Sequence, residues 1–427
     1  MRRSISTALR CITGLGLLAA SAGAEVLPDT EIAELQALHQ SRNFFALRER
    51  LEALPELPSQ PAEVRFLEAV VQQAFNQPEA SNQTIEDLLG LEELPQTLVL
   101  QLRNIRVTNE LRLHRYSAAL EIARTILASP VAGEDSAIHK QIFAKLSLLQ
   151  ALANFPPQET EIRGSSRLAL GNTRRVPLKI QGRSFQFALD TGANFSVIMR
   201  SEAENLGLKI LPASLVVSTS TAKQVLADVT VAEQVEIGKV LYRHAVFLVF
   251  PDELLTFPDG QRIPGLVGFP LVEAMGEVRF RRDNVLEIPK NPPVRTSKNL
   301  ALDELEPLIQ VRYGKDDLLC RLDTGAPQTV FYEPFFRRFQ DRIESSGQRI
   351  TAEAGGVGGM QEIPAYRLNK MTLTIAAAGV TLRQVDIYSQ PIREPQDNFL
   401  FCNVGLDVLQ QYRTYSINFR DMALVFK

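Results

Sequence analysis

The sequence has little histidine and little cysteine, and this scarcity excludes several kinds of chemistry. Its 427 residues include four histidines and three cysteines, with no H-E-x-x-H motif and no cysteine–histidine cluster of the zinc-binding kind. No G-x-S-x-G elbow and no Walker loop is present either. We therefore expect no metal and no cofactor, and we interpret the scattered histidines as surface or packing residues.

An excess of charge of one sign is also missing. The chain has 46 Lys and Arg against 49 Asp and Glu, a formal net charge of -3, so it has no bulk attraction for nucleic acid. We interpret local basic pairs such as Arg281-Arg282 as solvated surface, and we expect no nucleic-acid partner.

Long apolar runs are absent except near the N-terminus. Arg2 and Arg3 precede a short apolar stretch, residues 12–20, and Ala22-Gly23-Ala24 fits the small-x-small cleavage pattern. This pattern predicts a signal peptide, residues 1–24, cleaved near Ala24, and therefore an exported, periplasmic protein. The stretch is too short to span a bilayer comfortably. An uncleaved signal that anchors the chain to the membrane is the alternative.

Residues 25–155 have the apolar spacing of helices, punctuated by prolines. The segment 115–123 resembles the second helix of a tetratricopeptide hairpin, although no regular repeat period supports that family. We predict a tetratricopeptide-like domain of α-hairpins. Such arrays often hold a protein partner; a helical cap or spacer packed on the rest of the chain is the alternative.

From residue 167 onward the pattern changes to the period-two alternation of β-strands. We predict a linker at residues 156–166, lobe 1 at 167–290, a second linker at 291–302 and lobe 2 at 303–427. The chain is therefore predicted to be an α+β multidomain protein, helical first and mainly β afterwards.

The two lobes carry the same motifs in the same order. Asp190-Thr191-Gly192-Ala193 returns as Asp323-Thr324-Gly325-Ala326, each after a hydrophobic approach and before a polar and then an apolar stretch. A second landmark, residues 265–271 in lobe 1 and 402–409 in lobe 2, follows each aspartate at nearly the same spacing. Two ordered landmarks with matching flanks indicate an internal duplication.

These motifs resemble the aspartic proteases of the retropepsin type, in a bacterial, single-chain form with both lobes in one polypeptide. The resemblance covers about residues 166–427 and implies a bilobal, mainly β acid-protease fold with no cofactor. It also implies a catalytic dyad, Asp190 and Asp323, whose loops are supported by Thr191, Gly192, Ala193, Thr324, Gly325 and Ala326.

Two close carboxylates cannot both ionise cheaply, so they share a proton and can serve as base and acid together. Ala193 and Ala326 stand where pepsin-like enzymes have Ser or Thr, whose hydroxyl would lower the pKa of the carboxylate. We therefore predict a less acidic optimum than pepsin's.

Each lobe also offers one loop that fits a flap over the substrate. Such a flap excludes water and binds an extended peptide. An ordinary flexible loop is the alternative. The predicted flap and substrate-binding residues are Ser218, Thr219, Ser220, Gly356, Val357, Gly358 and Gly359.

Cys320 and Cys402 each lie three residues before a landmark, Asp323 and Gly405. In the resembled fold the strands that carry these two cysteines are neighbours, so the cysteines could form a disulfide. Disulfides persist in exported proteins, which are kept in an oxidising environment. Two buried free thiols are the alternative.

Together these features predict a monomeric aspartic endopeptidase that cleaves peptides or unfolded proteins among exported or envelope proteins. Water activated between Asp190 and Asp323 would attack the peptide bond. Two alternatives remain: a non-catalytic peptide-binding scaffold of the same fold, and an autoinhibited protease gated by the helical domain.

Overall fold

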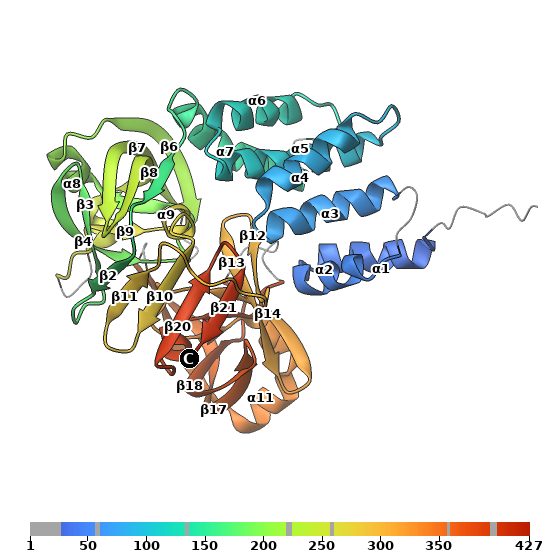
Figure 1. Cartoon of the computed structure of the whole chain (residues 1–427). Coiled ribbons are helices and arrows are strands. Elements are labelled where there is room, and N and C mark those ends of the chain that lie inside the picture. Colours follow the sequence, from blue (N-terminus) through green and yellow to red (C-terminus); the bar gives the residue numbers. More distant parts are fainter. Residues whose placement is uncertain are drawn as a thin grey trace, which may run out of the picture.

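The computed structural model describes residues 27–55, 60–131, 133, 136–218, 224–256, 260–356, 359–392 and 399–427. Helices come first along this part of the chain, and a mainly β part follows (Figure 1). No helix within the described residues is both long and apolar enough to cross a membrane. The predicted signal peptide, residues 1–24, lies outside the described residues.

The helical domain is a series of neighbouring helices, each packed against the next or next but one. Proline is the N-cap residue of three helices, and Pro78 opens a fourth, where its missing N–H is one that the first turn leaves unpaired. The helices are α1 Asp29–Gln40, α2 Phe44–Glu52, α3 Ala62–Ala74, α4 Pro78–Leu89, α5 Gln96–Arg112, α6 Tyr116–Leu127 and α7 Ala137–Leu152.

Lobe 1 is built on an eight-stranded sheet of order β1-β8-β5-β9-β4-β3-β7-β6. Strand β8 is almost continuously apolar because both of its faces are buried. The strands are β1 Glu159–Ile162, β3 Val176–Ile180, β4 Arg183–Leu189, β5 Ser196–Met199, β6 Ile210–Ser218, β7 Gln224–Ile237, β8 Val240–Phe250 and β9 Gly265–Val267, with short helices α8 Arg200–Asn205, η1 Asp252–Leu255 and α9 Phe269–Glu273.

Lobe 2 has a second eight-stranded sheet, of order β12-β13-β14-β19-β15-β18-β17-β16. Its strands are β12 Leu300–Asp303, β13 Glu306–Tyr313, β14 Asp316–Leu322, β15 Val330–Phe331, β16 Gln348–Gly356, β17 Gly359–Ile375, β18 Ala378–Tyr388 and β19 Cys402–Val404, with helices α10 Glu333–Arg338, α11 Gln340–Ser346 and α12 Leu406–Leu409. In both lobes the strand before the aspartate pairs in parallel with the strand of the second landmark, β4 with β9 and β14 with β19.

A third sheet joins the two lobes. It has the order β2-β11-β10-β20-β21, and β10 of lobe 1 pairs antiparallel with β20 of lobe 2 (Figure 1). The lobes therefore share backbone hydrogen bonds as well as one chain. The strands are β2 Ser166–Ala169, β10 Glu277–Arg281, β11 Val285–Ile288, β20 Thr414–Asn418 and β21 Ala423–Phe426.

Both predicted linkers contain residues of strands. Within 156–166, strand β1 pairs with β8, and β2 already begins at Ser166. Within 291–302, strand β12 begins at Leu300 and forms a hairpin with β13. Strand β1 has the sequence Glu-Thr-Glu-Ile and lies at a sheet edge, where polar side chains face solvent and no apolar alternation is needed.

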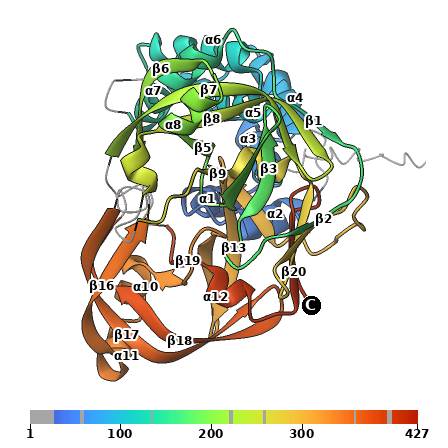
Figure 2. The same cartoon turned by 90° about the vertical axis from the view of Figure 1, so that its left-hand side faces the viewer.

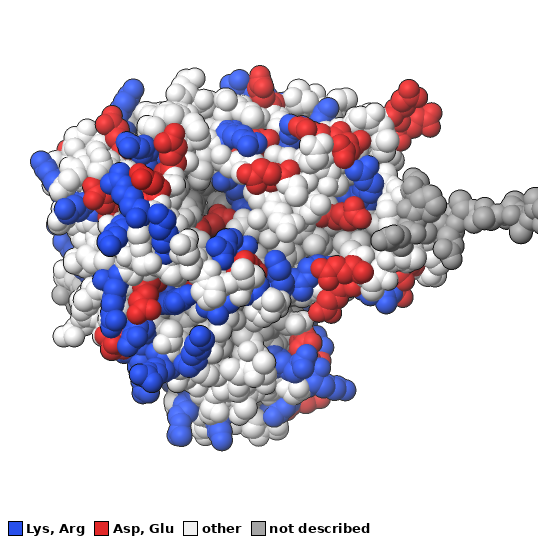
Figure 3. Space-filling view, in the orientation of Figure 1, with Lys and Arg blue, Asp and Glu red and all other residues white. Residues whose placement is uncertain are grey.

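The helical domain contacts both lobes. Helices α5 to α7 share an apolar cluster with lobe 1, and α7 lies beside β6. Arg112 of α5 pairs with Glu273 of α9 at 2.8 Å, and Lys145 of α7 pairs with Glu304 of lobe 2 at 2.5 Å. Figure 2 shows the hairpins β6–β7 and β16–β17 on the same side of the molecule. Charged side chains of both signs are interspersed over the face in Figure 3.

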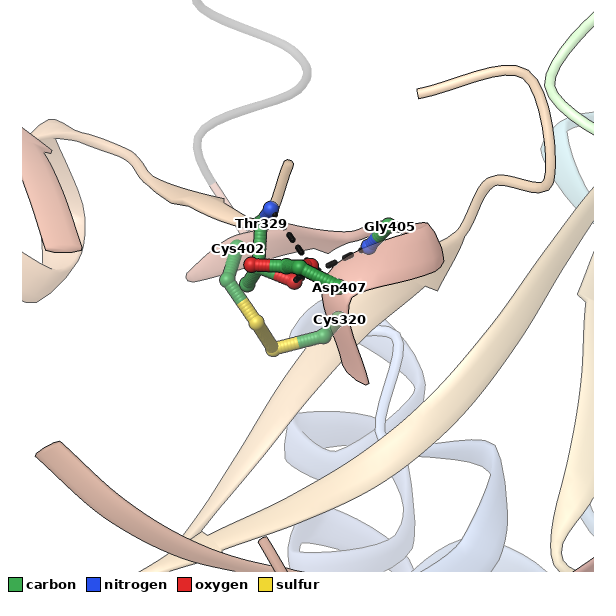
Figure 4. The surroundings of a disulfide bond; sticks show 5 residues. All are labelled: Cys320, Thr329, Cys402, Gly405 and Asp407. Atoms are coloured by element: carbon green, nitrogen blue, oxygen red, sulfur yellow. Dashed lines mark hydrogen bonds between the residues drawn. A yellow bond between two sulfur atoms is a disulfide. The ribbon is translucent and has the colours of Figure 1, made fainter. Parts of the chain in front are cut away.

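Cys320 and Cys402 are register partners on the parallel strands β14 and β19, and they form a disulfide. Their Cα atoms are 4.8 Å apart, and both side chains are fully buried. Figure 4 shows the bridge close to Thr329, Gly405 and Asp407. The bridge closes a loop with a sequence separation of 82.

Replacing both cysteines by alanine should lower the unfolding free energy of lobe 2 by about 2–4 kcal/mol, because the unfolded chain regains the entropy of that loop. Urea denaturation of the oxidised protein and of the double variant measures the change. Wild type kept under reductant is the control, since it has the same side chains without the bond. Equal midpoints in all three samples would contradict the prediction.

Candidate active site

The two predicted catalytic aspartates occupy equivalent positions, each directly after a buried strand. Asp190 follows β4, and its N–H donates to the carbonyl of Val267 at 3.0 Å. Asp323 follows β14, and its N–H donates to the carbonyl of Val404 at 3.0 Å. Both carboxyl groups are therefore held at the same edge of their sheets by the second landmark.

The glycines of the repeated motif bring the two carboxyl groups together. Each donates its N–H at 2.8 Å to the aspartate of its own loop, Gly192 to Asp190 and Gly325 to Asp323. Each also faces the aspartate of the other lobe: a Cβ at Gly192 would lie 2.8 Å from Cγ of Asp323, and one at Gly325 would overlap Asp190. A side chain at either position would push the lobes apart, so glycine is required here.

The two threonines bind each other's loops across the lobe interface. The N–H of Thr191 donates to Oγ1 of Thr324 at 3.0 Å, and the N–H of Thr324 donates to Oγ1 of Thr191 at 3.1 Å. Each hydroxyl then donates to a carbonyl of the opposite lobe, Leu322 at 2.9 Å or Leu189 at 3.2 Å. Both threonines are buried, so these bonds do not compete with solvent and hold the loops in one arrangement.

Ala193 and Ala326 connect the loops to the second landmark. The carbonyl of Ala193 accepts from the N–H of Phe269 at 2.8 Å, and that of Ala326 accepts from Leu406 at 2.9 Å. The N–H of Ala326 also donates to Oδ1 of Asp323 at 3.0 Å. The predicted support residues thus all lie around the dyad.

Two further support residues escaped the sequence analysis. The hydroxyls of Ser196 and Thr329 accept from the N–H groups of Gly268 and Gly405, both at 3.0 Å. Each lies six residues after its aspartate, so a position-by-position comparison of the two motifs would have found them.

Arg321 and Asn403 were also missed, and they are present in lobe 2 alone. Nδ2 of Asn403 donates to Oδ2 of Asp323 at 2.9 Å. Arg321 donates to the carbonyl of Gly192 in the other lobe and pairs with Glu306 at 3.3 Å. The available signal was a difference between the two copies: lobe 2 has polar residues at these two positions of the repeat, and lobe 1 has apolar residues there.

The environment of the dyad favours a bound proton at neutral pH. Burial, the negative charge of Asp323 and a hydrogen bond with it together raise the pKa of Asp190 from 3.8 to about 7. Arg321 and the N–H of Gly192 oppose this effect. Like charges in contact cannot both ionise without a large cost, so the pair retains one proton.

The predicted flap residues lie partly outside the described residues. Ser218 ends β6, and Gly356 and Gly359 are register partners at the end of the β16–β17 hairpin. Thr219, Ser220, Val357 and Gly358 lie outside the described residues. Their role as a flap stays a prediction.

Comparison with known sequences agrees with this geometry. Residues 176–271 match the sequence model of the aspartyl protease family. The matched segment runs from β3 into α9 and includes Asp190. Lobe 2 lies outside this match, and it repeats the strand pairing and the aspartate loop of the matched segment.

Two solved structures are similar to parts of the chain. One is a retropepsin-like aspartic protease from Rickettsia conorii, with 20% identity over 31% of this chain and 95% of that chain, at a TM-score of 0.22. The other is the EIAV protease complexed with the inhibitor HBY-793, with 21% identity over 25% of this chain and 86% of that chain, at a TM-score of 0.18. No curated protein matches the sequence.

The raised pKa of Asp190 predicts a pH-dependent stability. In the folded state Asp190 holds a proton that the unfolded chain releases near pH 3.8, and it loses that proton only near pH 7. The contribution of Asp190 to the unfolding free energy should therefore fall as pH rises from 4 to 7, by up to about 1.4 kcal/mol per pH unit.

Asp190→Asn removes this titration, so the stability of the variant relative to wild type should increase from pH 4 to pH 8. Urea denaturation at each pH measures both proteins. Parallel curves for the two proteins would contradict the prediction.

Proposed function

We propose that this protein is an aspartic endopeptidase that hydrolyses peptide bonds in exported or envelope proteins. The observation that supports it most is the pair of carboxyl groups, Asp190 and Asp323, held together by glycines and threonines that cross the lobe interface. A turn with a purely structural role would not need its carboxyl group to lie against a carboxyl group of the other lobe. Two aspartates that share one proton must lie in contact in this way.

The reaction requires an acid, a base and one water molecule. The ionised carboxylate takes a proton from the water, whose oxygen forms a bond to the carbonyl carbon of the scissile peptide. The protonated carboxyl donates a hydrogen bond to the carbonyl oxygen, where negative charge develops. Transfer of a proton to the amide nitrogen then breaks the C–N bond and releases a carboxylic acid and an amine.

The hairpins β6–β7 and β16–β17 are suited to bind an extended substrate. Strand β6 and strand β16 each end their sheet, so their outer backbone groups can pair with a peptide strand. We infer that the substrate is an extended peptide or an unfolded segment. The export of the enzyme is supported by the apolar N-terminal stretch and by the Cys320–Cys402 bridge, because disulfides persist in oxidising compartments.

Asp190→Asn and Asp323→Asn should each abolish cleavage of a denatured protein mixture, because each variant lacks either the acid or the base. We expect wild type to be most active between about pH 4 and 7, since the pair must keep one proton. The assay compares the three proteins from pH 3 to 8. Wild-type activity retained by both variants, or an optimum below about pH 3, would contradict the mechanism. Wild type without turnover would favour a peptide-binding scaffold.

The position of α7 favours a second candidate, an autoinhibited form of the same protease. Helix α7 packs beside β6, a strand of the predicted lobe 1 flap, and Lys145 holds the helix to Glu304 of lobe 2. A helix attached in this way to both lobes would restrain flap opening. Deleting the helices would strip the apolar cluster that they share with lobe 1, so a point variant is the cleaner test.

Lys145→Met should raise kcat/KM several-fold if α7 restrains the flap, because opening and closing of such hairpins limits turnover in many enzymes. Arg124→Met is the matched control, since it removes an exposed cation of α6 in the same domain. Cleavage of a fluorogenic peptide mixture gives both values. Unchanged activity in Lys145→Met would leave the helical domain as a structural cap.

A further inference from the structure

The two halves of the active site are copies in backbone but not in side chains. Residue 321 pairs with residue 403 on the parallel strands β14 and β19, and residue 188 pairs with residue 266 on β4 and β9. These positions are equivalent, since 188 and 321 both lie two residues before the aspartate. Lobe 1 has Ala188 and Leu266 there, whereas lobe 2 has Arg321 and Asn403.

The asymmetry changes the number of donors to each carboxyl group. Asp323 accepts from the N–H groups of Gly325 and Ala326 at Oδ1 and from Asn403 at Oδ2. Asp190 accepts from the N–H of Gly192 within the described part of the chain. Hydrogen bonds to a carboxylate stabilise its ionised form. The extra donors therefore favour the negative charge on Asp323.

Asn403 is the donor that distinguishes the two lobes by its side chain. It is 8% exposed, so its bond to Asp323 has little competition from solvent. An ionised carboxylate has no proton to donate, so it requires the NH₂ face of the amide. Leu266, in the equivalent place, offers Asp190 no donor.

Several charged or titratable groups face the dyad. Arg321 from β14 acts on both aspartates, and it is itself paired with Glu306 of β13, with Tyr332 close to it after β15. Arg321 acts on both members, and more strongly on Asp323 than on Asp190. Asn403 donates a hydrogen bond to Asp323 and adds to that preference.

We propose that Asn403, supported by Arg321, is a positioning residue that keeps the negative charge on Asp323 and the proton on Asp190. The inference rests on the proposed function and assigns the roles within it. Asp323 takes the proton from the attacking water, and Asp190 donates to the carbonyl oxygen of the substrate. The raised pKa of Asp190 agrees with this assignment.

The first test follows the two carboxyl groups directly. The full chain is labelled with ¹³C at the aspartate carboxyls, and NMR shifts are recorded from pH 3 to 9; Asp190→Asn and Asp323→Asn identify the two signals. We expect Asp190 to keep its proton to a higher pH than Asp323 in wild type, which leaves a gap between the two titrations. Asn403→Leu should narrow this gap by about one unit, since one unit corresponds to a lost hydrogen bond of about 1.4 kcal/mol.

The reciprocal variant Leu266→Asn should narrow the gap from the other side by adding a donor to Asp190. Leucine already fits the equivalent place in lobe 1, so Asn403→Leu is expected to fold. If Asn403→Leu does not fold, Leu266→Asn still tests the proposal. A gap that is unchanged in the folded variants, or Asp190 titrating below Asp323, would overturn the proposal.

The second test is kinetic. In the pH profile of kcat/KM, the acidic limb should move to higher pH by about half to one unit in Asn403→Leu. Asn403→Ser retains a hydrogen-bond donor, so its limb should move less. A merely structural role would lower activity without moving the limb. If wild type cleaves peptides but the variants leave the titrations of the two aspartates unchanged, this inference alone is overturned. If the titrations change as expected but wild type cleaves nothing, the proposed protease function alone is overturned.

Discussion

Two carboxyl groups that repel each other must be held in contact, and the rest of the two-lobed structure depends on this requirement. The aspartates do not stabilise this contact themselves. Buried hydrogen bonds between Thr191 and Thr324 hold the two loops together, and the glycines allow the close approach because they have no side chain. The bonds lie in a region of low dielectric, where unmade partners would be costly. The retained proton is a consequence of that enforced contact.

The motifs and their order could be predicted from the sequence because each motif could be checked against its second copy. Asp190 and Asp323 were identifiable since each has the same flanks, and each follows a strand that becomes buried toward its end. The edge strands β1 and β12 were less visible, because β1 is short and polar and β12 has no alternation, with three consecutive buried residues. Their pairing is decided by the neighbouring strand rather than by their own pattern.

Residues that differ between the copies were the hardest to predict. Asn403 and Arg321 break the repeat, so a search for repeated residues passes over them. Their importance arises from contacts with Asp323 and Gly192, which are distant in sequence and meet only after folding. The contacts of the helical domain with lobe 2, such as Lys145 with Glu304, could not be predicted for the same reason.

The shared sheet in which β10 pairs with β20 has a consequence for how the active site assembles. Two separate copies of a lobe would meet with a probability that depends on their concentration, and dilution would take the site apart. Here the second lobe is always present at the effective concentration set by a short tether. The site can therefore form in a single molecule at any dilution, and each half is free to accept substitutions that the other half does not share.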